Sequence, residues 1–361
     1  MSLKFNNINF YNFRNLNDKQ ISFSDGLTVL VGQNAVGKTN CIEALQLLTS
    51  GVSFRKSRPI ELIAKDKEFS KIEGKISGDG RIIDVACEIR PNKKTFIKNN
   101  KNVRAASLPQ TLPSILFCPD DLAFVKGSAS VRRDELDGLG CKISEGYSKV
   151  LSAYLRAIEQ RNKLLKDDWI DQSLLEAWDS SVSVGAATLL MHRYNLFLRI
   201  KDLIEEIYST IAEEELLECN YLSTLDESPL GYSRDELSEI YFNKLKENRL
   251  NDIKRGFTQV GPHRDDLSFK VDGKDSRIYC SQGQQRTIVL AWKMAEVMLI
   301  EQITTQKPLL LLDDVMSELD SSRRSAVTSF IESGIQAVVT TTNLGYFPEE
   351  LLQEAKVVSY D

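Results

Sequence analysis

Histidine is scarce in this chain of 361 residues, which carries only His192 and His263. The six cysteines are scattered along the sequence, and no two of them have the Cys-x-x-Cys spacing of zinc sites and redox pairs. A catalytic metal centre built on imidazole or thiolate ligands is therefore not expected. Isolated buried thiols are the simpler interpretation of the cysteines.

Long hydrophobic runs are also missing. No apolar stretch approaches the roughly 18 residues of a membrane span, and the first residues lack the apolar segment of a secretory signal. We therefore expect a cytosolic protein. The net charge of −5 argues against a surface coated with positive charge for nucleic acid, although a local basic groove stays possible.

What the chain does contain is a glycine-rich loop between a predicted strand and a predicted helix. Gly-x-x-x-x-Gly-Lys-Thr follows the apolar run 27–31 and opens a helical pattern that ends at Gly51. This is the P-loop, whose backbone N–H groups and helix N-terminus attract phosphate. Lys38 is expected to reach the β- and γ-phosphates of a nucleotide, and Thr39 to ligate Mg²⁺. The predicted loop residues are Gly32, Gln33, Asn34, Ala35, Val36, Gly37, Lys38 and Thr39.

A pair of acids near the end of the chain belongs to the same chemistry. Asp313 and Asp314 follow an unbroken apolar run, 309–312, which predicts a buried strand. Ligands of open α/β sheets bind at the carboxyl ends of the strands. Asp313 is expected to hold Mg²⁺ through water, and Asp314 to orient or activate the water that attacks the γ-phosphate.

The order of the predicted elements indicates an α/β domain interrupted by helices. Residues 1–115 are predicted as the first half of an ATPase lobe, with strands and small β-hairpins turning at 78–80 and 98–102. Residues 259–361 are predicted as its second half, in which helices and strands alternate as in a parallel sheet. The second half is expected to hold strands at 267–271, 309–312 and 336–341, and helices at 284–302 and 322–333.

Residues 116–258 are predicted to form an inserted, mostly helical lobe. Ser173-x-x-Glu176 and Ser233-x-x-Glu236 have the spacing of capping boxes, each expected to open a helix. Residues 189–211 are expected to form a further long helix.

Ser281-Gln282-Gly283-Gln284-Gln285 resembles the signature of the ABC-type ATPases, and Ser317-Glu318-Leu319-Asp320 resembles the loop that crosses their dimer seam. A serine and a glycine at the start of a helix can donate hydrogen bonds to a γ-phosphate. In that superfamily they act on ATP held by the opposite protomer. The resemblance therefore assigns Ser281 a catalytic role, and Ser281, Gly283 and Gln284 a place in the nucleotide site of a second copy.

At finer grain the chain resembles the RecF family of bacterial recombination mediator ATPases. The matching stretches occur in the family's order along nearly the whole length, and together they are highly specific. They are Asn12-Phe13-Arg14-Asn15-Leu16, Gly32 to Thr39, Gly261-Pro262-His263-Arg264-Asp265-Asp266, Ser281 to Thr287, and Leu312 to Asp320.

The resemblance implies an ABC/SMC/Rad50-like ATPase head with an inserted helical lobe, using ATP and Mg²⁺. It implies an ATP-dependent homodimer that binds double-stranded and gapped DNA in the cytoplasm, at the nucleoid. RecR and RecO would be partners in loading RecA during repair, replication and the SOS response. It also implies weak, DNA-stimulated ATP hydrolysis, and contacts of Arg14 and Asn15 with the nucleotide. Asp314 replaces the superfamily's usual Glu and is one methylene shorter, so slow turnover is expected.

Two other functions fit the sequence less well. The nucleotide-binding subunit of an ABC transporter would carry Leu-Ser-Gly-Gly-Gln and a histidine after the last buried strand, where this chain has 340–343 as Thr-Thr-Thr-Asn. A small-molecule kinase would need neither the signature nor the crossing loop.

The residues that contact DNA stay open at this stage. The candidates for phosphate contacts are Arg55, Lys56, Ser57, Arg58, Lys93, Lys94, Lys98, Lys101 and Arg104, for which plain surface charge is an equal alternative. His263 is expected to stabilise a turn rather than to act in catalysis.

Overall fold

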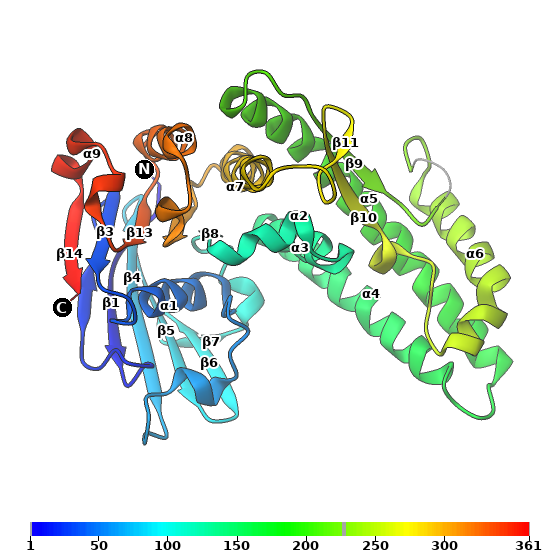
Figure 1. Cartoon of the computed structure of the whole chain (residues 1–361). Helices are drawn as coiled ribbons and strands as arrows, with labels where there is room; N and C mark the ends of the chain where they lie inside the picture. Colours follow the sequence, from blue (N-terminus) through cyan, green and yellow to red (C-terminus); the bar gives the residue numbers. More distant parts are fainter. Residues whose placement is uncertain (1, 226–228, 361) are drawn as a thin grey trace. The chain divides into compact units, whose positions relative to one another are not determined.

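The computed structural model describes residues 2–225 and 229–360, which form two compact units (Figure 1). The first unit comprises Met1–Asp121 and Leu290–Asp361, and the second comprises Leu122–Val289. The sequence predicted domain boundaries at 115/116 and 258/259. The second unit therefore extends further along the chain than the predicted helical lobe, to Val289. Its extension includes the signature motif.

A five-stranded parallel sheet forms the centre of the first unit. Its strand order is β14-β3-β13-β12-β8, and all neighbouring pairs are parallel. The strands are β14 (Lys356–Tyr360), β3 (Leu27–Gly32), β13 (Ala337–Thr341), β12 (Leu309–Asp313) and β8 (Ser114–Phe117). Every residue of β12 and β13 is buried, which explains their unbroken apolar sequences.

A six-stranded antiparallel sheet, ordered β2-β1-β4-β5-β6-β7, lies in the same unit. The strands are β1 (Lys4–Tyr11), β2 (Gln20–Ser22), β4 (Ser70–Gly78), β5 (Arg81–Arg90), β6 (Lys93–Lys98) and β7 (Lys101–Val103). Apolar and polar residues alternate along β4 and β5, so one face packs into the core and the other is open. The predicted turn at 78–80 is confirmed, and all three of its residues have positive φ.

Helix α1 (Lys38–Ser50) packs between the two sheets, and one hydrophobic core includes side chains of both sheets and of α1 (Figure 1). The helix ends at Gly51 in the left-handed conformation, as predicted. The remaining helices of this unit are α8 (Ser321–Glu332) and α9 (Glu349–Glu354), with 3₁₀ turns η1 (Pro59–Leu62), η2 (Ala105–Ser107), η3 (Pro119–Leu122), η5 (Val315–Ser317) and η6 (Leu344–Tyr346). The chain passes from the second unit to the first within α7 (Gln282–Thr304).

The second unit is mostly helical, with one small sheet. Its helices are α2 (Ala123–Lys126), α3 (Ala129–Ile143), α4 (Glu145–Leu164), α5 (Gln172–Ile211) and α6 (Arg234–Arg255), with the 3₁₀ turn η4 (Pro262–Arg264). The sheet has the order β11-β10-β9, with β9 (Leu217–Leu222), β10 (Asp266–Val271) and β11 (Lys274–Asp275). The pairing of β9 with β10 places residues beyond 258 in this unit.

Two sequence predictions for the helices were wrong. The capping box at Ser173 does not open a helix, because Asp171 is the N-cap of α5 and accepts hydrogen bonds from the N–H groups of Ser173 and Leu174. The separate helix expected at 189–211 is the continuation of α5, which runs unbroken for 40 residues. The capping box at Ser233 is confirmed, since Ser233 and Glu236 bond reciprocally at the start of α6.

Buried ion pairs connect the helices of the second unit to its later segment. Arg161 on α4 lies 2.7 Å from both Asp179 and Asp252, and its guanidinium also donates to Thr258 at 2.8 Å. All four of these side chains are inaccessible to solvent. This network, together with the β9–β10 pairing, explains why the boundary of the unit lies beyond residue 258.

Over the residues that the structure describes, no helix is both long enough and apolar enough to cross a membrane.

Candidate nucleotide-binding site

The P-loop connects the carboxyl end of β3 to the first turn of α1, as the sequence predicted. The Lys38 ammonium donates to the carbonyl oxygens of Gly32 and Gln33, at 2.7 Å each, so the side chain lies over the loop. Burial lowers the pKa of Lys38, while the nearby Asp314 and Asp313 act in the opposite direction. A cation held over a loop of backbone N–H groups beside a helix N-terminus suits a polyphosphate.

Two glycines of the loop have no room for a side chain. A Cβ on Gly32 would lie 2.3 Å from the carbonyl oxygen of Tyr360 on the neighbouring strand β14. Gly37 has φ of 110°, and a Cβ there would lie 2.8 Å from Asn15 Oδ1. The glycines are therefore required by the conformation of the loop and by its close packing.

Acidic and hydroxyl oxygens gather beside the loop at the carboxyl ends of β12 and β13. Asp313 Oδ1 accepts hydrogen bonds from the hydroxyl groups of Thr39, at 2.9 Å, and Thr340, at 2.8 Å. Burial raises the pKa of Asp313, and these two hydrogen bonds oppose that shift. A carboxylate and a threonine hydroxyl are oxygen ligands of the kind that Mg²⁺ prefers, so these residues fit the metal that the sequence predicted.

Asp314 adopts the left-handed conformation, with φ of 54°, directly after the strand. Its N–H donates to Thr340 Oγ1 at 2.9 Å, which fixes the backbone. Its Oδ1 atom is buried and has no hydrogen-bond partner among the described residues. Burial of an acceptor that has no hydrogen-bond partner carries a desolvation penalty in free energy. This oxygen is therefore suited to receive a hydrogen bond from a water molecule or ligand.

Asn15 contacts the P-loop from the connection after β1. Its side-chain N–H donates to the carbonyl of Ala35 at 3.2 Å, and its Oδ1 accepts from Asn40 at 2.7 Å. Asn40 in turn accepts from Arg55 Nη1 at 2.8 Å. Asn15 thus lies against the loop, and its contact with the nucleotide stays a prediction.

Arg14 is engaged within the protein. It donates to both carboxylate oxygens of the fully buried Glu43, at 2.5 and 2.9 Å, and to Ser57 Oγ at 2.6 Å. A contact of Arg14 with nucleotide stays a prediction. Glu43 was missed in the sequence analysis, although an acid on the apolar face of a predicted helix is a signal of a buried ion pair.

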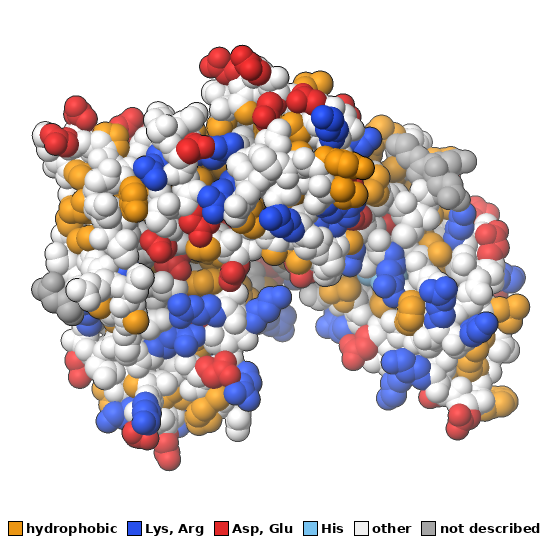
Figure 2. Space-filling view, in the orientation of Figure 1, with side chains coloured by type: hydrophobic (Ala, Val, Ile, Leu, Met, Phe, Trp, Pro, Cys, Tyr) orange, Lys and Arg blue, Asp and Glu red, His pale blue; other side chains and the backbone are white. Residues whose placement is uncertain are grey.

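Several of the basic residues suggested for DNA have partners in the first unit. Arg58 pairs with Glu61 at 2.7 Å, and Lys98 donates to Thr111 at 2.8 Å. Figure 2 shows Lys and Arg interspersed with Asp and Glu over the face that it presents. No surface of uniform positive charge is evident on that face.

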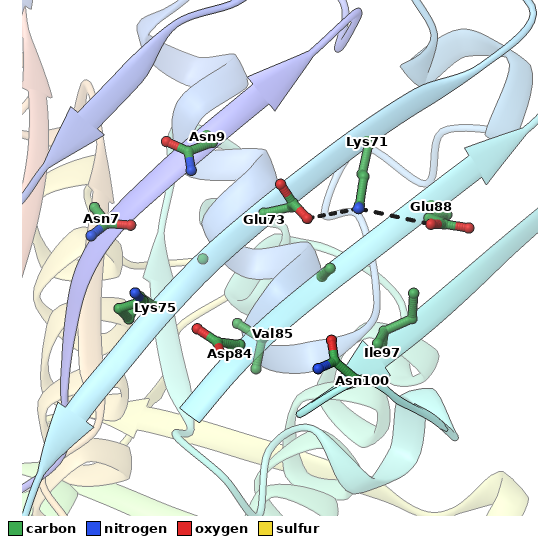
Figure 3. Close-up of a pocket in the computed structure, with 12 residues that line it drawn as sticks. Asn7, Asn9, Lys71, Glu73, Lys75, Asp84, Val85, Glu88, Ile97 and Asn100 are labelled. Atoms are coloured by element: carbon green, nitrogen blue, oxygen red, sulfur yellow. Dashed lines mark ion pairs between the residues drawn. The ribbon is translucent and has the colours of Figure 1, made fainter. Parts of the chain in front are cut away.

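A hollow of about 500 Å³ lies on the open face of the antiparallel sheet (Figure 3). Lys71 lines it and lies 2.7 Å from Glu73 and 3.9 Å from Glu88. Lys75 and Asp84 also line it. Because three acids (Glu73, Asp84 and Glu88) and only two lysines line the hollow, it offers no electrostatic advantage to a phosphate backbone.

The signature motif opens α7 in the second unit. The Ser281 N–H donates to Gln284 Oε1 at 2.8 Å, and Ser281 Oγ accepts from the Gln284 N–H at 3.2 Å. These two bonds are those of a capping box. Ser281 is exposed, and because its Oγ is the acceptor in the bond from Gln284, its hydroxyl hydrogen is available for donation to a ligand.

The predicted site residues are thus divided between the units. The P-loop, Arg14, Asn15, Asp313 and Asp314 belong to the first unit, whereas Ser281, Gly283 and Gln284 belong to the second. Asp320, the last residue of the predicted crossing loop, caps α8 by accepting from the Arg323 N–H at 3.0 Å.

Comparison with known proteins places this site in a family. Residues 4–358 match the family model for the RecF/RecN/SMC N terminal domain. The chain is 38% identical to the DNA replication and repair protein RecF of Heliobacterium modesticaldum, over 97% of this chain and 95% of that protein. It is 36% identical to the DNA replication and repair protein RecF of Oceanobacillus iheyensis, over 96% and 95% of the two chains.

Solved structures agree with this comparison. The recombination mediator protein RecF-ATP in the RecFOR pathway superposes with a TM-score of 0.88 at 33% identity, over 95% of this chain and 94% of that one. The RecF-ATPrS structure of the same pathway gives 0.89 at 31%, over 96% and 94%. The Smc head domain of Pyrococcus furiosus, at 17% identity and a TM-score of 0.57 over 99% and 93%, shares the fold. Together with a P-loop, paired acids and a capped signature helix, these matches show that the chain belongs to the RecF family of SMC-type, ATP-binding ATPase heads.

Proposed function

We propose that this chain is an ATP-gated clamp for DNA, active as a homodimer in which each ATP is bound by the P-loop of one copy and the signature helix of the other. The observation that carries the proposal is the exposed, capped Ser281 at the N-terminus of α7. An exposed hydroxyl donor at a helix N-terminus favours an anion, and here the chain supplies a separate, complete phosphate loop in its other unit.

Within one copy, the P-loop backbone and Lys38 bind the phosphates, with Asn15 supporting the loop and Arg14 approaching the nucleotide. Thr39 and Asp313 hold Mg²⁺, which when bound offsets the negative charge of the phosphates. Asp314 accepts a hydrogen bond from the attacking water through its unpartnered oxygen and orients that water toward the γ-phosphate.

From the other copy, Ser281, Gly283 and Gln284 contact the γ-phosphate. Loss of that phosphate removes these contacts and therefore weakens the dimer. Hydrolysis is weak, because Asp314 has a short side chain with which to hold the water, and DNA stimulates it. Slow hydrolysis therefore sets how long the dimer persists before its two copies separate.

The proposed ligand of the dimer is duplex DNA near single-strand gaps, where with RecR and RecO it promotes loading of RecA in the cytoplasm, at the nucleoid. The relatives named DNA replication and repair protein RecF, and the structures of RecF in the RecFOR pathway, support this part of the proposal. Contacts limited to phosphates would make binding independent of sequence and steeply dependent on salt.

The dimer is tested by sedimentation velocity with ATP and Mg²⁺. The wild-type chain should shift from monomer to dimer, and Ser281→Arg should stay monomeric while binding ATP as tightly as the wild type. Dimerisation retained in Ser281→Arg would contradict the proposal. Titration of gapped duplex DNA at two salt concentrations, with and without ATP, tests the clamp itself.

A further inference from the structure

The signature helix is held at its first turn by a carboxylate from a segment that no motif identified. Glu215 lies between the end of α5 and the start of β9. Its Oε1 accepts a hydrogen bond from Gln284 Nε2 at 3.0 Å. Its Oε2 accepts a hydrogen bond from the hydroxyl of Tyr208, at 2.5 Å. All the residues concerned belong to the second unit.

The bond to Glu215 determines how the Gln284 amide is oriented. The amide oxygen accepts from the Ser281 N–H, and the amide nitrogen donates to Glu215. A carboxylate can only accept and a backbone N–H can only donate, so the amide has one orientation that satisfies both. Both polar atoms of the Gln284 side-chain amide are therefore fixed by hydrogen bonds.

Glu215 is itself fixed. Tyr208 is fully buried in the last turns of α5, and its ring cannot move without disturbing the packing there. The hydroxyl of Tyr208 therefore defines where one oxygen of Glu215 lies. A continuous series of hydrogen bonds runs from Tyr208 through Glu215 and Gln284 to Ser281.

We propose that Glu215 is a positioning residue that holds Gln284, and through it Ser281, in the arrangement that receives the phosphate of a second copy's nucleotide. This inference rests on the proposed ATP-dependent dimer. Without Glu215 the Gln284 amide can rotate, the capping box opens, and the first turn of α7 loses the order that presents its hydroxyl and N–H donors. Since the same contacts begin at Tyr208, the C-terminal end of the 40-residue α5 contributes to the order of the signature helix.

The test compares Glu215→Ala with Glu214→Ala, which removes the same charge from the neighbouring, exposed position. Glu215→Ala should weaken ATP-dependent dimerisation about tenfold or more, the range expected when a charged hydrogen-bond partner is lost. The affinity of the P-loop for ATP, measured in the monomer, should be unchanged. Glu214→Ala should behave as the wild type. Glu215→Gln keeps an acceptor for Gln284 without the charge and should restore most of the dimerisation.

A second measurement needs neither ATP nor a dimer. Hydrogen exchange of the backbone N–H groups over residues 281–285 should become faster in Glu215→Ala and stay unchanged in Glu214→Ala. Unchanged exchange in Glu215→Ala would overturn the inference, as would equal loss of dimerisation in the two alanine variants. If the wild type failed to dimerise with ATP, the proposed function would fail, and the exchange result would still decide the role of Glu215.

Tyr208→Phe covers the case in which Glu215→Ala does not fold. This variant keeps the buried ring and removes only the hydroxyl that orients Glu215. We expect several-fold weaker dimerisation at unchanged ATP affinity, together with faster exchange at residues 281–285. Wild-type behaviour of Tyr208→Phe in both measurements would contradict the proposal.

Discussion

The hydrogen bonds and the burial of His263 favour the uncharged form of its imidazole. Its Nε2 faces the carbonyl of Thr258 at 3.0 Å and must donate, so its Nδ1 accepts from the Tyr154 hydroxyl at 2.6 Å. Burial lowers the pKa of His263 to about 4, and the cations of Arg264, Arg133 and Arg193 act in the same direction. The expectation that His263 stabilises a turn rather than performs catalysis agrees with these contacts.

The lowered pKa of His263 predicts that the second unit loses stability in mild acid. The unfolded chain takes up a proton near pH 6.5 and the folded chain only near pH 4, so the free energy of unfolding should fall as the pH drops between these values. The contribution is on the order of 3 kcal/mol. Buried Asp265, whose pKa is raised by burial, acts in the opposite direction, so the measurement must be a difference between variants.

Denaturant unfolding from pH 7 to pH 4 checks this prediction. His263→Gln can make both hydrogen bonds without titrating, so its stability should fall less with decreasing pH than that of the wild type. His192→Gln, at the other histidine of the chain, is the matched control. Identical pH profiles for wild type and His263→Gln would show that this imidazole does not govern acid stability.

Asp314 allows a prediction about hydrolysis alone. Asp314→Asn keeps the shape of the side chain, and asparagine tolerates the left-handed backbone at this position. We expect ATP to bind with an affinity within a few-fold of the wild type, and hydrolysis to fall about a hundredfold or more in single-turnover assays. Asp66→Asn, at an exposed aspartate with φ of 61°, is the control for backbone conformation. Hydrolysis retained in Asp314→Asn would assign the water to another residue.

At the scale of elements, local signals predicted local structure. The P-loop, the stop of α1 at Gly51, the turn at 78–80 and the box at Ser233 each depend on residues within a few positions of one another, and all are confirmed. Edge strand β14 and the pairing of β8 with β12 depend on partners far away in the sequence, so the sequence did not reveal them. Strand β9 alternates buried and exposed residues at its start, a period-two signal that was overlooked.

The start of α5 offers a direct comparison between two caps. Asp171→Ala should lower the free energy of unfolding by about 1 kcal/mol, because its carboxylate caps two N–H groups. Ser173→Ala lies inside the first turn and should change stability by less than about 0.5 kcal/mol, as surface substitutions usually do. Thermal and denaturant unfolding of both variants measures the difference. A larger loss for Ser173→Ala would restore the capping box that the sequence suggested.

At the scale of the whole molecule, the sequence predicted an ATPase lobe interrupted by a helical insertion. The structure has two units of this kind, but the signature motif lies in the unit of the insertion. The reason is physical: β10 pairs with β9, and Arg161 contacts Thr258, so the segment before α7 is bound to the helices. These contacts join residues that are far apart in the sequence, by 97 positions for Arg161 and Thr258 and by about half that for β9 and β10, beyond the reach of any sequence motif.

The nucleotide site shows the same limit. Lys38, Thr39, Asp313 and Asp314 could be predicted because their motifs are contiguous, and the structure brings them together in one unit. Glu43, an acid on the apolar face of the helix that the P-loop opens, could have been suspected as half of a buried ion pair. Glu215 could not, because it acts on the signature motif from a segment 69 positions away. We propose that the phosphate loop of one copy and the signature helix of a second copy bind the same nucleotide.

Mixing two inactive variants tests that claim most directly. Lys38→Ala lacks a working phosphate loop, and Ser281→Arg lacks a working signature helix. Each alone should be inactive in ATP hydrolysis, whereas their equimolar mixture should recover activity, because a mixed dimer contains one intact site assembled from both chains. A mixture as inactive as its components would contradict a nucleotide shared between two copies.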